Sequence, residues 1–98
     1  MMFQLKIHDT DKGKVVAACD SGMIGDIHEE DGVRLEVRED FYRGEEAGID
    51  EVEEALKEYV TANLVGNELV DALRERGVVE EQEIGEVDGV KHVQLFRI

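Results

Sequence analysis

The stretch DEVEEALKEYVTANLVGNELVDALRERG, residues 50–77, decides the fold, because its apolar residues recur at helical spacing. The first apolar stripe consists of Val52, Ala55, Leu56, Tyr59, Val60 and Asn63. This stripe predicts an amphipathic helix over residues 50–64. Asp50 is a suitable N-cap for that helix, and Glu53 stands where a glutamate completes a capping box.

A second helix is predicted directly after the first. Gly66 can adopt the left-handed conformation that ends a helix, and Asn67 can cap the next one. The apolar side of the second helix consists of Leu69, Val70 and Leu73. Gly77 ends it, so two helices joined by a tight turn at Gly66 are expected.

Apolar runs on the N-terminal side predict strands. Residues 3–8 alternate between apolar and polar, as a half-buried strand does. Residues 15–19 are continuously apolar and small, which is typical of a central strand covered on both faces. Turn-forming residues at 9–13 separate the two runs, so a hairpin over residues 3–19 is expected. A third strand, at an edge of the sheet, is predicted over residues 33–37 from a further alternation.

Two strands are predicted at the C-terminal side, over residues 78–84 and 90–98, around the hairpin turn signal Asp88-Gly89. The order of strands, helices and strands predicts a single α+β domain over residues 1–98. We expect two helices packed in two layers on a mainly antiparallel sheet of about five strands. The residues expected to be largely buried are Val16, Ala18, Leu56, Tyr59, Val60, Leu73 and Phe96.

The charge is strongly negative and unevenly distributed. There are 25 Asp and Glu against 11 Lys and Arg, a net charge of −14, and residues 45–86 hold 14 of the acids and 3 of the bases. A polyanion repels phosphate backbones, so non-specific nucleic-acid binding is disfavoured. The acids either form a solvated surface or make a docking face for a basic partner, such as a ribosomal protein.

No run approaches the roughly 20 apolar residues of a membrane span, and no export signal is recognisable. A protein that is soluble, cytoplasmic and free of membrane contact is therefore expected. Its one cysteine, Cys19, cannot form an internal disulfide, which agrees with a reducing compartment.

Five short segments resemble a known family. They are KIH at residues 6–8, VVAACD at 15–20, FYRGE at 41–45, NLVG at 63–66 and GVKHVQ at 89–94. In this order they resemble the archaeal family catalogued as domain of unknown function 424, over nearly the whole chain. The resemblance implies an archaeal protein and assigns no activity. The family typically has a proline before the histidine that corresponds to His92, where this chain has Lys91.

Three polar residues interrupt apolar faces and are the first candidates for a binding site. Asn63 interrupts the helical stripe, and His92 and Gln94 share a strand face with Val90 and Phe96. Asn63 either bonds backbone groups in the helix-to-helix turn or orients a ligand. His92 is either a satisfied, partly buried histidine or an acid, base or ligand. A site, if present, is expected where the turn at Asn63 approaches the sheet.

His8, Tyr42 and Glu45 are further candidates. Tyr42 follows Phe41, and two neighbouring aromatic rings can stack on a base, anchor a protein partner or close the end of a core. Glu45 could pair with Arg43 or with a cation. His8 could join Asn63, His92 and Gln94 around one cleft.

Neither a metal site nor a catalytic constellation is predicted. His8, Cys19, Asp20 and His92 are possible ligand types, but they lack paired spacing, and adjacent Cys19 and Asp20 should point to opposite faces. No nucleophile signature or phosphate-binding loop is present. No cofactor is expected, and zinc should not be needed for folding.

These observations favour a non-enzymatic binding module in information processing, within translation or RNA metabolism. Its partner would be a basic protein or a ribonucleoprotein component. One alternative is a small-ligand-binding protein or small enzyme with a site near Asn63 and His92. The other is a protein-interaction module that uses the acidic helical face. Whether the protein is an enzyme stays open at this stage.

Overall fold

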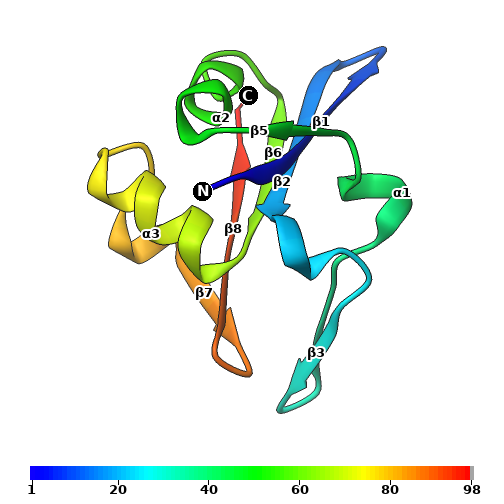
Figure 1. Cartoon of the computed structure of the whole chain (residues 1–98), viewed down its shortest axis with the longest axis vertical. Coiled ribbons are helices and arrows are strands. Elements are labelled where there is room, and N and C mark those ends of the chain that lie inside the picture. Colours follow the sequence, from blue (N-terminus) through cyan, green and yellow to red (C-terminus); the bar gives the residue numbers. More distant parts are fainter. Residues whose placement is uncertain (98) are drawn as a thin grey trace.

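A six-stranded mixed sheet forms the centre of the protein, whose computed structural model describes residues 1–97. Its strand order is β5-β1-β2-β6-β8-β7 (Figure 1). The strands are β1 (Phe3–Thr10), β2 (Gly13–Asp20), β5 (Glu45–Ala47), β6 (Thr61–Val65), β7 (Ile84–Val87) and β8 (Val90–Phe96). Neighbours are antiparallel except β2 and β6, which are parallel.

Helices cover one face of this sheet, and a small hairpin covers part of the other. We call them the helix face and the hairpin face. The helices α2 (Ile49–Ala55) and α3 (Asn67–Glu75) lie on the helix face. The hairpin face carries the short helix α1 (Glu39–Tyr42) and a two-stranded sheet of β3 (Ile27–Glu30) and β4 (Val33–Glu36). Short 3-10 turns span Ser21–Met23 and Glu81–Glu83. No helix in residues 1–97 is long and apolar enough to cross a membrane.

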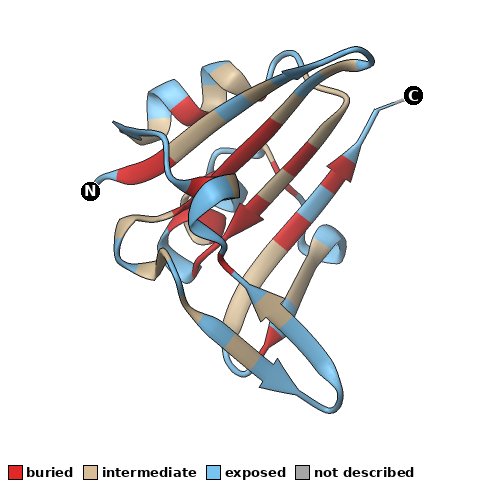
Figure 2. Ribbon diagram, turned by 90° about the vertical axis from the view of Figure 1, so that its right-hand side faces the viewer, coloured by how far each residue is buried: buried red, intermediate tan, exposed pale blue. Residues whose placement is uncertain are grey.

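Both faces of the central strands are buried, as predicted for residues 15–19. Val16 and Ala18 pack into the helix-face core, whereas Ala17 and Cys19 pack into a second core on the hairpin face. Figure 2 shows the buried residues running along these strands.

The predicted α+β class is confirmed by helices that pack on a mostly antiparallel sheet. The prediction of two layers is wrong, because the β3–β4 hairpin and α1 add a partial third layer.

The predicted helix over residues 50–64 is wrong in its second half. Helix α2 ends at Ala55, and residues 61–65 form the central strand β6. In β6, Ala62 and Leu64 point into the helix-face core, while Asn63 points to the hairpin face. The strand gains backbone hydrogen bonds to both β2 and β8, and this tertiary pairing outweighs a local helical pattern. Asn63 consequently does not lie in a helix-to-helix turn.

Both helices also begin differently from the prediction. The N-cap of α2 is Gly48 and not Asp50. The amide of Gly48 donates a hydrogen bond to Glu51 Oε1 at 3.1 Å. Helix α3 is capped by a residue distant in sequence, because the Asp20 carboxylate accepts the amides of Glu68 and Leu69 at 3.2 and 2.9 Å.

Gly66 permits this arrangement. Its φ of +120° suits glycine, and a Cβ there would overlap the Asp20 carboxylate. Asn67 is the first residue of α3, not its cap. Its side chain binds the carbonyl of Gly89 and the amide of Lys91, so it joins α3 to the β7–β8 turn.

The outer strands differ from the prediction in position. The strand predicted at an edge of the main sheet, residues 33–37, corresponds to β4 (Val33–Glu36), whose strand partner within residues 1–97 is β3. The strand predicted over 78–84 begins at Ile84, and the one predicted over 90–98 ends at Phe96, with Ile98 outside the described residues.

Most of the predicted core is buried, with one clear exception. Val16, Ala18, Leu56 and Leu73 are buried, and Tyr59 and Val60 are half-buried. Phe96 is 67% exposed, so its predicted burial is wrong. Strand alternation puts Val93 and Leu95 in the helix-face core and Phe96 on the other face, where it stays open to solvent.

Candidate functional site

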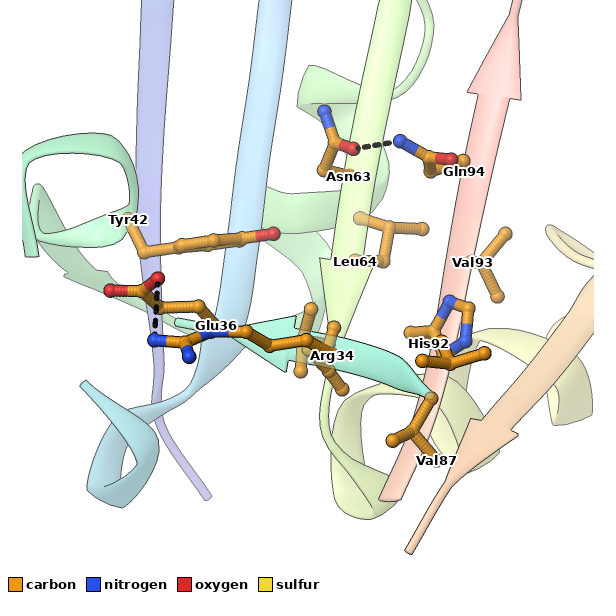
Figure 3. A pocket seen from close by; sticks show the side chains of 12 residues that line it. Arg34, Glu36, Tyr42, Asn63, Leu64, Val87, His92, Val93 and Gln94 are labelled. Atoms are coloured by element: carbon orange, nitrogen blue, oxygen red, sulfur yellow. Dashed lines mark hydrogen bonds and ion pairs between the residues drawn. The ribbon is translucent and has the colours of Figure 1, made fainter. Parts of the chain in front are cut away.

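A groove of about 340 Å³ lies between β4 and the hairpin face of β6 and β8 (Figure 3). We call it the Tyr42 groove. The residues that line it include Val33, Arg34, Leu35 and Glu36 from β4, Tyr42 from α1, Asn63 and Val65 from β6, Val87 from β7, and His92 and Gln94 from β8. Four of the six predicted site residues therefore meet in one concavity.

Two amide side chains form one side of the groove. Asn63 and Gln94 are opposite each other in the antiparallel pairing of β6 and β8. Gln94 Nε2 donates a hydrogen bond to Asn63 Oδ1 at 3.0 Å. The amide nitrogen of Asn63 and the amide oxygen of Gln94 have no partner among residues 1–97, so the pair keeps one free amino group and one free carbonyl oxygen for another molecule.

Tyr42 brings a hydroxyl group into the groove. The residue is only 6% exposed and belongs to the second core, where Phe41 packs edge-on against its ring at 5.1 Å between centroids. Figure 3 shows the ring extending from α1 toward β6. Its hydroxyl forms no hydrogen bond within the described part of the chain. Burial, and secondarily the nearby Cys19, raise the pKa of Tyr42 to about 12, so the hydroxyl stays protonated.

His92 lies farther along β8, between Val65 on β6 and Gly85 on β7. A Cβ at Gly85 would lie 2.8 Å from both Cε1 and Nε2 of the imidazole, so glycine makes room for this ring. Neither ring nitrogen has a hydrogen-bond partner in residues 1–97. His92 is thus half-buried with both nitrogens available, which differs from the alternative of a satisfied histidine.

The charged residues of the groove are paired with each other. Arg34 lies 3.5 Å from Glu36 and 3.6 Å from Glu29, and all three side chains are exposed. The one lining cation is therefore neutralised by carboxylates of its own hairpin.

His8 and Glu45 lie outside the groove. His8 stacks on Phe41 with ring centroids 4.8 Å apart, and its Nε2 lies 2.9 Å from the carbonyl oxygen of Phe41. It lines a neighbouring hollow that shares Tyr42 with the groove. Glu45 is exposed on β5, at the far edge of the sheet. Arg43 pairs with Glu39 at 3.2 Å instead of Glu45.

Cys19 is held as a thiol inside the second core. Burial, followed by the charges of Asp20 and Asp26, raises the pKa of the thiol to about 12. Asp20 points to the opposite side, toward α3, as predicted. Within residues 1–97, no three His, Cys, Asp or Glu side chains gather as metal ligands do.

The groove wall on β4 was missed by sequence reasoning, although a signal for it exists. Asp31-Gly32 is a hairpin turn sequence, and it joins β3 to β4. His28 lies between this hairpin and the β7–β8 turn, and the two segments are joined by a hydrogen bond from the Asp88 amide to Glu30 Oε1 at 2.7 Å. Its Nε2 is buried without a hydrogen-bond partner among the described residues, 3.5 Å from Asp26, and its Nδ1 lies 4.0 Å from Asp88.

Comparisons with known proteins agree with the resemblance seen in the sequence. The family model described as "Protein of unknown function (DUF424)" matches residues 7–98. The chain is also similar to the crystal structure of an uncharacterized conserved protein from Methanopyrus kandleri. The two are 31% identical with a TM-score of 0.80, over 98% of this chain and 91% of the other. No curated protein matches the chain.

Proposed function

We propose a binding function for this chain, which belongs to the DUF424 family, and we place the ligand in the Tyr42 groove. The observation that carries the proposal is the hydroxyl of Tyr42. It belongs to a residue that is only 6% exposed and that lines the groove, yet it has no hydrogen-bond partner in residues 1–97. The hydroxyl oxygen is not among the fully buried unpaired atoms of these residues, so water reaches it in the groove, and a bound ligand could replace that water as its hydrogen-bond partner.

The chemistry of the groove supports binding more than catalysis. Nucleophilic catalysis needs an activated nucleophile beside a base. The Cys19 thiol and the Tyr42 hydroxyl both have a raised pKa and therefore stay protonated at neutral pH. His92 could accept a proton, but the groove holds no activated group beside it among the described residues. A non-enzymatic binding module fits this arrangement best.

The expected setting of such a module is translation or RNA metabolism in the cytoplasm. With a net charge of −14, the protein would be repelled by RNA phosphates. The chain would then associate with the components of translation or RNA metabolism by binding a basic protein or a ribonucleoprotein component. The groove would bind a small ligand or a single chemical group of that partner.

The acidic face of α2 and α3 is the competing binding site, but within residues 1–97 it has no exposed apolar patch beside its acids. A docking face needs an exposed apolar patch beside the acids. The large hydrophobic residues that are exposed in residues 1–97 are Met1, Met2, Ile7, Ile27, Val33 and Phe96, and none lies on α2 or α3. Val33 lines the groove instead, which favours the groove as the binding surface.

Nuclear magnetic resonance of the labelled protein tests this function. Small-molecule extracts of the native host and a library of neutral and charged small molecules would be added in turn. We expect the backbone signals of Asn63, His92 and Gln94 to shift with at least one compound, and the shift to weaken in Tyr42→Phe. Tyr59→Phe is the matched control, because Tyr59 packs against the helix-face core. Groove signals that respond to nothing in either collection would refute the proposal.

A further inference from the structure

The charged residues around the groove do not favour the binding of an ionic ligand. Arg34 is already bound by Glu29 and Glu36, so it offers no free cation to a phosphate or carboxylate. Asn63, Gln94 and the protonated Tyr42 are uncharged. An anionic ligand would also meet the field of a chain with a net charge of −14. Glu36, the carboxylate among the lining residues, is paired with Arg34, so it offers no free anion to a cationic ligand. The groove thus presents no unpaired charge of either sign, which favours an uncharged ligand.

The hydrogen-bonding groups select a ligand that both accepts and donates. The amide pair leaves a free amino group on Asn63 and a free carbonyl oxygen on Gln94. If both amides are turned over, the two residues exchange these roles, but one free amino group and one free carbonyl oxygen still remain. Tyr42 adds a further donor, and His92 can serve in either role. A carbonyl next to an N–H satisfies this set.

The walls select a flat ligand of modest size. Apolar side chains line the groove from two elements, Val33 and Leu35 from β4 and Val65 from β6. A volume of about 340 Å³ is at the small end of ligand pockets and suits one or two rings. Flat rings can place their faces against such walls while their edges reach polar groups.

We propose that the Tyr42 groove binds the –CO–NH– edge of an uncharged nucleobase, as found in uracil or hypoxanthine, either as the free base or as its nucleoside. This inference rests on the proposed binding function and names the ligand class for the same site. The base edge faces the Asn63–Gln94 pair and Tyr42, and the ring lies between β4 and β6. Neither a phosphate nor a nucleic-acid chain is part of the recognised group.

The test uses four ligands with the whole protein. Uracil and uridine carry the proposed edge, 1,3-dimethyluracil lacks the N–H, and uridine monophosphate adds a charge. We expect uracil and uridine to shift the signals of Asn63, His92 and Gln94, and uridine monophosphate to bind more weakly than uridine. Dimethyluracil should produce no shift. A nucleoside that binds more tightly than the free base identifies the nucleoside as the source, and the reverse identifies the base.

Two variants separate recognition from folding. Tyr42→Phe removes only a hydroxyl without a protein partner, and Gln94→Met replaces an exposed amide with an apolar chain of similar length. Each should weaken uridine binding about three- to tenfold, the net effect of one hydrogen bond, with an unchanged melting temperature. Tyr59→Phe should bind uridine as the parent does.

The outcomes distinguish this inference from the proposed function. Groove signals that shift only with compounds lacking the –CO–NH– edge overturn the ligand class and leave the binding function standing. Dimethyluracil binding as tightly as uracil, or uridine monophosphate or a short RNA binding more tightly than uridine, also overturns the inference. A groove that responds to none of these compounds and to no compound of the broader screen overturns both.

Discussion

Replacement of Gly66 by alanine should destabilise the protein through two separable effects. The backbone φ of +120° is strained for any residue with a Cβ, at a cost of about 1–3 kcal/mol. The added Cβ also overlaps the carboxylate of Asp20 and displaces the cap of α3, which costs about 0.5–2 kcal/mol. The sum is about 1.5–5 kcal/mol, or a fall in melting temperature of roughly 6–40 °C for a chain of this size.

Urea denaturation followed by circular dichroism measures this loss, and two comparisons isolate its parts. Gly77→Ala is the control for backbone strain, because φ is +75° there and no atom lies within 4 Å of the added Cβ. In an Asp20→Ala background the overlap is absent, so Gly66→Ala should cost about 0.5–2 kcal/mol less than in the parent. Equal costs in both backgrounds, or a loss no larger than that of Gly77→Ala, would refute the reasoning.

Three further predictions concern charge and the groove. Raising monovalent salt from low to molar concentration should raise the melting temperature, because salt screens the mutual repulsion within a chain of net charge −14. Glu54 and Glu58 are each paired with a lysine, so the effect is expected from the net charge and not from repulsion between these two residues. A flat or falling melting temperature would contradict this prediction. Burial raises the pKa of Asp20 above its ordinary value, and the amides of Leu69 and Glu68 offset this only in part. The contribution of the Asp20 side chain to stability is then complete below about pH 3.9 and declines as the pH rises through the raised pKa. The free energy of unfolding of the parent minus that of Asp20→Asn, measured in urea melts, should therefore be larger at pH 3.5 than at pH 7. A difference that grows with pH would contradict this. Asn63→Ala should cost less than about 1 kcal/mol in the same melts, because its partner is exposed to water, and a loss of 3 kcal/mol would indicate a structural role instead.

Residues 56–65 show why part of the fold was not predictable from the sequence. Val60 and Asn63 continue a helical stripe, yet Ala62 and Leu64 also alternate with their neighbours as in a strand. Both patterns coexist in one segment, and local propensity does not choose between them. The choice is made by β2 and β8, which are distant in sequence and leave a place for one strand between them. By contrast, the hairpin over residues 3–19 depends on adjacent residues and was predicted well.

The candidate site was predictable in its members but not in its construction. Asn63, His92 and Gln94 each interrupt an apolar pattern, which is a signal that one sequence provides. Their grouping was expected from a turn that does not exist, and it arises instead from the pairing of β6 with β8. The opposite wall, with Arg34, depends on how the β3–β4 hairpin folds over the sheet, and no local pattern specifies that placement.

The parallel pairing of β2 with β6 divides the sheet along a seam. On one side lie β5, β1 and β2, all from residues 3–47, and on the other lie β6, β8 and β7, all from residues 61–96. The Tyr42 groove straddles that seam, since Tyr42 and β4 come from the first half and Asn63, His92 and Gln94 from the second. Neither half contains the groove alone. Exchange of halves between two copies of the chain would therefore build each groove from two polypeptides, and separation of the halves would abolish it.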